Sequence, residues 1–183
     1  MEAATGASHA RTSSSVIDGF ASSWRQALAV CGGLGVLAAA FDMLVRMPLH
    51  LPGHRGLIGM SILVFARVVT RQPWSASATA ATSALIVAAP VISARPSAAA
   101  LYLVSALVLD AACLLFATWR ERVWFLALAA GLAHGAKAVA LWLMGDRIAA
   151  GFGVQLASHI GFGLSGGFIA AQLWAMTQRS RAH

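Results

Sequence analysis

The sequence predicts an all-α, polytopic membrane protein with six transmembrane helices and with both termini in the cytoplasm. Of the 183 residues, 59% are hydrophobic and 10% are charged, whereas roughly a quarter of the residues in a soluble domain are charged. Long apolar stretches follow one another from about Ala27 to Met176, and a membrane-spanning helix needs roughly 20 such residues. Alternating strands of about ten residues, which are typical of a transmembrane β-barrel, are not found.

Short polar segments divide the apolar region into six predicted spans. Residues 1–24, rich in Ala and Ser, are expected to form a mobile cytoplasmic tail that ends in a short interfacial helix. Residues 25–177 form the six-helix transmembrane domain, and residues 178–183 form a cytoplasmic C-terminal tail. The six spans are Ala27 to Met47, Gly56 to Val69, Trp74 to Ile92, Ala98 to Thr118, Val123 to Met144 and Val154 to Met176.

The arginines predict the orientation of the bundle. With the N-terminus in the cytoplasm, eight arginines fall inside and four outside, as the positive-inside rule expects. The basic residues are spread over the loops and form no stripe, so we expect a lipid bilayer and no nucleic acid as partner. The expected location is the inner (cytoplasmic) membrane. The inner arginines are Arg11, Arg25, Arg67, Arg71, Arg120, Arg122, Arg179 and Arg181, and the outer ones are Arg46, Arg55, Arg95 and Arg147.

No catalytic motif occurs in the structural context that it requires. There is no HExxH or Walker A pattern, and the only glutamates, Glu2 and Glu121, lie outside the predicted spans. The letters of GxGxxG and GxSxG do occur, at 161–166 and 163–167, but inside the sixth predicted span, whereas a dinucleotide fingerprint or a nucleophile elbow stands at the turn between a strand and a helix. We therefore predict that the chain is not an enzyme, has no resident cofactor and cannot energise transport with its own ATPase.

Ionisable side chains within the spans are few, and each is a candidate site because a charge inside a bilayer is costly. Counting about 1.5 Å per residue from the outer ends places those of four helices, Asp110 included, in the outer half. Such a group predicts a pocket that opens outward. The predicted ligand-binding residues are Asp42, His50, His54, His134, Lys137 and His159.

Two interpretations of this group stay open. Lys137 pairs with an anionic group of a ligand or with Asp42, while the histidines supply directional hydrogen bonds. Alternatively, Lys137 forms a structural ion pair with Asp42 or Asp110, and two histidines donate to backbone carbonyls.

The outer loop from Arg46 to Gly56 is the most distinctive local feature. Its prolines and glycine prevent a continuous helix and predict a defined turn. We expect Pro52, Gly53 and Arg55 to act as a gate. Two imidazoles with a nearby carboxylate can hold a transition metal, so His50, His54 and Asp42 are the metal candidates, beside contacts to an organic ligand and capping of the loop backbone.

Small residues recur at helical spacing in the first and sixth spans. Such rows allow helix backbones to approach closely, either within the bundle or against a partner membrane protein. The candidates for partner-helix packing are Ala27, Cys31, Gly35, Gly163 and Gly167.

Two segments resemble the substrate-binding S components of energy-coupling factor (ECF) transporters. They are Pro48 to Gly56 with the following Leu57 to Arg67 span, and His159-Ile-Gly-Phe-Gly163 with Gly166-Gly167. The resemblance implies uptake of a small solute, a vitamin-like molecule or a metal ion, bound from outside. It also implies a transmembrane coupling subunit driven by two ATPases as partner. Two alternatives remain: a metal or haem protein with His134 and His159 as ligands, and a non-catalytic membrane assembly or scaffold subunit.

Overall fold

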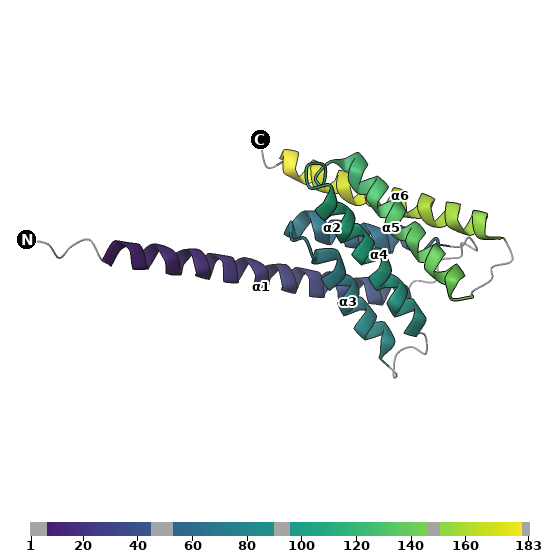
Figure 1. The fold of residues 1–183 in the computed structure, drawn as a ribbon, viewed down its shortest axis with the longest axis horizontal. Helices are drawn as coiled ribbons and strands as arrows, with labels where there is room; N and C mark the ends of the chain where they lie inside the picture. The colour runs from purple at the N-terminus through teal and green to yellow at the C-terminus, as the bar shows by residue number, and fades with distance from the viewer. Residues whose placement is uncertain (1–6, 45–52, 90–95, 146–150, 181–183) are drawn as a thin grey trace, which may run out of the picture.

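The computed structural model describes residues 7–44, 53–89, 96–145 and 151–180 (Figure 1). For residues 7–22 and 96–99 it describes the backbone, and for the rest of these ranges it describes the side chains as well. Within these ranges the chain forms six helices and no strand. They are α1 (Ala7–Leu44), α2 (Gly56–Thr70), α3 (Ser75–Ala88), α4 (Pro96–Leu115), α5 (Val123–Leu143) and α6 (Phe152–Ser180).

Three of these helices are long and apolar enough to cross a membrane, namely the segment Ser23–Leu44 of α1, α5 and α6. Helices α2 and α3 are apolar but have only 15 and 14 residues, or about 22 Å at 1.5 Å per residue. The all-helical prediction is therefore confirmed for the described residues. The count of six full spans and the orientation of the termini stay predictions.

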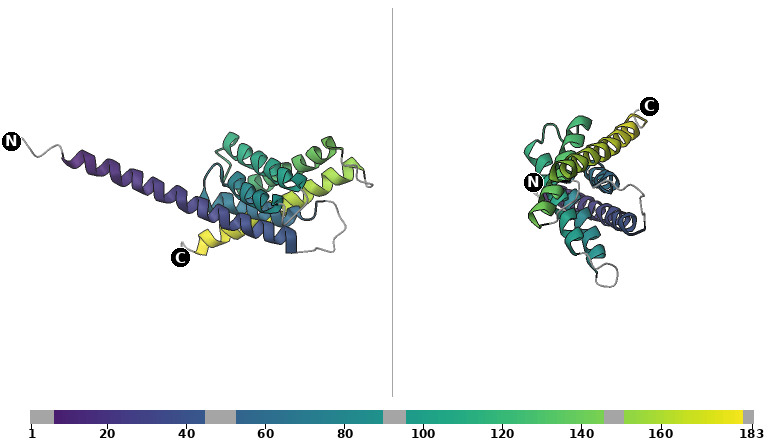
Figure 2. Two further views of the ribbon diagram at one scale, coloured as in Figure 1. Left: turned by 90° about the horizontal axis from the view of Figure 1, so that it is seen from below. Right: turned by 90° about the vertical axis from the view of Figure 1, so that its right-hand side faces the viewer.

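Helix α1 begins earlier than the sequence analysis expected. Residues assigned to a tail are helical from Ala7 onward and continue without a break into the first apolar segment. In Figures 1 and 2 this N-terminal half of α1 extends beyond the bundle, while the other helices gather around its C-terminal half. No proline interrupts the stretch before Pro48, and its many alanines favour a helix.

Helix α2 lies at the centre of the bundle. It contacts α1, α3, α5 and α6, and the outer helices pair as α1 with α3, α3 with α4, α4 with α5, and α5 with α6. The core around it contains Met60, Leu63 and Val64 of α2, Leu109 of α4 and Leu126 of α5. Because neighbouring helices surround it, α2 need not span the full hydrocarbon layer to keep its backbone out of lipid.

Glycines let α6 approach α2 and α5 closely. A Cβ atom at Gly163 would lie 2.6 Å from the carbonyl oxygen of Ala130 in α5, and one at Gly166 would overlap the carbonyl oxygen of Leu57 in α2. The Ser61 hydroxyl donates to the carbonyl oxygens of Leu57 (2.7 Å) and Gly166 (3.0 Å), which joins α2 to α6. These contacts fix the position of the α6 residues near the turn that precedes α2, and we call this end the loop end of the bundle.

The small residues proposed for a partner helix lie inside this bundle. In α1, Ala27 and Cys31 are buried, and a Cβ atom at Gly35 would lie 2.6 Å from Thr79 and Thr82 of α3. In α6, Gly163 and Gly167 pack against α5. These rows therefore serve contacts within the chain, and in this structure they present no surface to a partner protein.

Asp110 binds the start of α3 and does not belong to the group of polar residues with which the sequence analysis placed it. Its carboxylate accepts hydrogen bonds from the backbone N–H groups of Ala76 (3.3 Å) and Ser77 (2.8 Å) and from the Ser77 hydroxyl (2.7 Å). It thereby caps the N-terminus of α3, which follows the C-terminal end of α2. Its assignment to the outer group, and its pairing with Lys137, are wrong because its oxygens bind the first turn of α3.

Candidate functional site

The two ends of the central helix α2 each carry a cavity. The loop-end cavity lies beside the turn that precedes α2 and has about 310 Å³ of empty space, including its open mouth. It is lined by Asp42, Arg55, Gly56, Gly59, Met60, Leu63, Tyr102, Ser105, His134 and Lys137. Four of the helices, α1, α2, α4 and α5, thus contribute side chains to it.

An ion pair joins the end of α1 to the start of α2 at this cavity. Arg55 Nη1 lies 3.1 Å from Asp42 Oδ1, with the two side chains 50% and 17% exposed. Arg55 also occupies the N-cap position of α2. The end of α1 and the start of α2 are therefore joined by a partly exposed contact.

Two histidines stack beneath the turn that follows this loop. The rings of His134 and His159 have centroids 4.7 Å apart and planes inclined by 31°, and both side chains are 3% exposed. His134 Nε2 donates to the carbonyl oxygen of Gly53 (3.1 Å), and His159 Nδ1 donates to that of Gln155 (2.9 Å). Since a carbonyl only accepts, these bonds place the proton on Nε2 of His134 and on Nδ1 of His159.

This geometry does not fit two axial ligands of a haem. Rings on opposite faces of a porphyrin cannot lie in contact with each other, as those of His134 and His159 do. Among the described residues no group of three or more His, Cys, Asp or Glu side chains is arranged to hold a metal ion. Of the metal candidates, Asp42 is paired with Arg55, and His50 lies outside the described residues.

Glycines shape the turn above the histidines. Gly53 has φ of +80°, a left-handed conformation that favours glycine, and a Cβ there would lie 2.8 Å from His159 Nδ1. A Cβ at Gly56 would overlap the His134 ring. Because the turn is this close to the histidines, the first residues of α2 are held against α5 and α6.

Lys137 is the second cation that lines the loop-end cavity, beside Arg55. Its Nζ lies 5.3 Å from the centre of the Tyr102 ring, a cation–π contact. Among the described residues, Lys137 forms no ion pair within 4 Å; the pair of Asp42 is with Arg55. Asp42 acts on Lys137 electrostatically from beyond 4 Å, so the predicted direct pairing of these two residues is absent here.

The structure brings together most of the predicted ligand-binding residues, but not all of them. Asp42, His134 and Lys137 line the cavity, and His159 stacks behind His134. His54 lies in the adjacent turn and does not line the cavity. His50 and Pro52 fall outside the described residues. Tyr102 and Ser105 were missed because a single tyrosine and a serine in an apolar span resemble ordinary packing residues.

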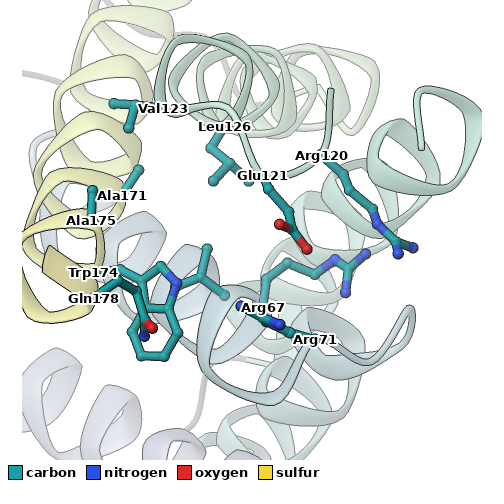
Figure 3. Close-up of a pocket in the computed structure, with 11 residues that line it drawn as sticks. Arg67, Arg71, Arg120, Glu121, Val123, Leu126, Ala171, Trp174, Ala175 and Gln178 are labelled. Atoms are coloured by element: carbon teal, nitrogen blue, oxygen red, sulfur yellow. The ribbon is translucent and has the colours of Figure 1, made fainter. Parts of the chain in front are cut away.

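A second cavity, missed in the sequence analysis, lies at the opposite end of α2. This arginine cavity has about 700 Å³ of empty space, including its open mouth. Figure 3 shows arginines and Glu121 on one side of it and Trp174 and Gln178 on the other. It is lined by Arg67, Val68, Arg71, Arg120, Glu121, Val123, Leu126, Ala171, Trp174, Ala175 and Gln178.

The sequence carried a signal for this second cavity. Arg67 lies inside an apolar span, four residues before Arg71, where a charge is costly unless it has a function or a partner. Both residues were interpreted only as determinants of orientation. The contribution of Arg120 and Glu121 depends on how the α4–α5 turn folds back toward α2, which spacing does not show.

Comparison of the chain with protein-family models, with curated proteins and with solved structures gives no significant match.

Proposed function

We propose that this protein is a six-span membrane protein that binds a small solute with an anionic or hydrogen-bond-accepting group in the loop-end cavity. The proposal rests on the position of Lys137 in the cavity. Its ammonium lines the cavity against Tyr102, and no carboxylate of the described chain lies within 4 Å of it. A cation inside an apolar bundle needs a partner or water, and a solute anion supplies one.

Apolar side chains on the outside of the bundle support a membrane location. Leu107 and Leu114 of α4, Leu128 and Leu132 of α5 and Leu173 of α6 are each more than half exposed. Exposed apolar surface of this extent is typical of contact with lipid. The inner membrane and the N-in, C-in orientation are part of the proposal and follow from the arginine distribution.

The chemistry of the lining suggests what the solute offers. Lys137 provides a point charge and the Tyr102 ring provides a flat surface. The Ser105 hydroxyl donates to the Leu101 carbonyl (3.3 Å) and can offer a solute its oxygen as an acceptor. In this structure the space between these side chains is narrow, so a solute would have to widen the cavity on entering it. Entry from outside would open the turn at Gly53 and break the contact between Arg55 and Asp42.

The resemblance to S components extends this proposal to transport. Under that hypothesis the loop before α2 opens for solute capture, and an ATPase-driven coupling subunit completes uptake. The rows of small residues in α1 and α6 are occupied within the chain, so a coupling subunit would contact other, lipid-facing residues.

To test the proposal, the full chain is purified in a mild detergent, and native mass spectrometry identifies any small molecule bound to it. Wild-type protein is expected to carry a small molecule, and Lys137→Met is expected to lose about nine-tenths of it. The loss corresponds to removal of one charge-assisted contact, about 1.5 to 3 kcal/mol. Arg122→Gln, an exposed charge that lines neither cavity, is the matched control.

A bound molecule retained by Lys137→Met would contradict the proposed role of this lysine. A preparation with no small molecule but with a second membrane protein would favour the alternative of an assembly subunit. That alternative has its own support in the structure, because Asp42, Asp110 and both stacked histidines are satisfied by partners within the chain.

A further inference from the structure

The arginine cavity concentrates positive charge that the described chain does not neutralise. Arg67, Arg71 and Arg120 line it together with one carboxylate, Glu121, so three positive charges face one negative charge. The described residues form one ion pair with an N–O distance within 4 Å, that of Arg55 with Asp42 at the other end of α2. None of the three arginines of the cavity is therefore paired with Glu121, and the net charge of the lining is +2.

Arg67 is buried with part of its hydrogen-bonding capacity unused. The residue is 3% exposed, its Nη1 donates to the carbonyl oxygen of Gln72 (2.6 Å), and its Nε is buried without a partner. A guanidinium has five N–H donors, and a buried charge without an anion is costly. Asp110 acts on Arg67 electrostatically from beyond 4 Å, but its oxygens already accept from the first turn of α3.

The other wall of the cavity is apolar and aromatic. Val68, Leu126 and Ala171 line it, and the Trp174 ring lies across from the arginines (Figure 3). At the same end of the bundle, the exposed Trp119 lies between α4 and α5 and the exposed Trp124 lies in the first turn of α5, with ring centroids 5.7 Å apart. Tryptophan collects at the level of lipid headgroups, so this end fits the interface between hydrocarbon and water.

We propose that the arginine cavity binds a phosphate group. Arginine forks match the several acceptor oxygens of a phosphate, and the apolar wall accepts the carbon skeleton attached to it. Two sources share this chemistry, the headgroup of an anionic phospholipid and a free phosphate ion or ester. Anionic headgroups are abundant on the cytoplasmic leaflet and attract basic residues there. The proposal does not depend on the solute of the loop-end cavity.

The test compares two arginines of the same turn. Arg120 lines the cavity, whereas Arg122, which is also exposed, does not. The full chain in a mild detergent is titrated with phosphatidylglycerol or with phosphatidylcholine, and bound lipid is counted by native mass spectrometry. In parallel, inorganic phosphate is added, and the midpoint of thermal unfolding is measured.

Wild-type protein is expected to bind phosphatidylglycerol about tenfold more tightly than phosphatidylcholine, and Arg120→Gln is expected to lose most of this preference. Arg71→Gln, a second exposed lining residue, should behave like Arg120→Gln, and Arg122→Gln like the wild type. If phosphate instead raises the unfolding midpoint with the same dependence on Arg120, the source is the soluble one. Equal effects of Arg120→Gln and Arg122→Gln, or no response to either probe, would overturn the proposal.

Discussion

The two ends of helix α2 differ in how far the chain neutralises its own charges. At the loop end the chain satisfies most of its own polar groups: Asp42 binds Arg55, and His134 and His159 donate to backbone carbonyls. At the arginine end the cavity keeps an excess of positive charge, and buried Arg67 retains a donor without a partner. Groups that the chain satisfies are explained by folding, whereas Lys137 and Arg67 are charged groups without an ion-pair partner within 4 Å. Buried neutral donors without a partner also occur, among them Gln155 Nε2 beside His159.

The largest effect is expected from closing the space between the loop turn and the histidines. In Gly56→Ala the new methyl group overlaps the His134 ring, which must turn away and release the Gly53 carbonyl. We expect a loss of about 3 kcal/mol of stability, measured as a lower midpoint of thermal unfolding in detergent. Gly161→Ala is the matched control, because nothing lies within 4 Å of a Cβ there. An equal midpoint for both variants would mean that the turn is not held by His134.

A smaller loss is expected from removing the cap of α3, near the arginine end. Asp110→Ala leaves the N–H groups of Ala76 and Ser77 without their acceptor and should cost about 2 kcal/mol. Hydrogen exchange of the first turn of α3 should increase more than that of α5. If exchange rises uniformly or not at all, Asp110 does not act as the cap.

The smallest effect is expected from the ion pair at the loop end. Because Arg55 is 50% exposed, Arg55→Gln should change the stability by less than about 1 kcal/mol. The same substitution should speed binding of a solute at the loop-end cavity if the contact with Asp42 delays opening. A loss of stability comparable to that of Asp110→Ala would show that the pair is a main structural contact and would weaken the comparison between the two ends.

The sequence predicted the helices better than the polar contacts. Apolar runs, separated in the first half of the chain by Pro48, Pro52, Pro73 and Pro90, locate five of the six helices to within a few residues, because hydropathy and helix breakers act locally. The exception is α1, where the Ala- and Ser-rich start was interpreted as a tail. Counting residues from the predicted outer ends of the spans placed Asp42, His134 and Lys137 in one group, and these three residues do line one cavity. The same counting included Asp110, whose carboxylate binds the first turn of α3.

The sequence by itself determined the all-helical class, the apolar character of the helices and the presence of a few costly charges within them. Only the tertiary structure decided which of those charges meet a partner. Asp42 and Arg55 are 13 residues apart and form a pair, whereas Lys137 faces Tyr102 and Arg67 faces a cavity built from three separate parts of the chain. Pairing depends on which helix faces converge, and convergence is set by close contacts such as that of Gly163 with Ala130, which no local pattern contains.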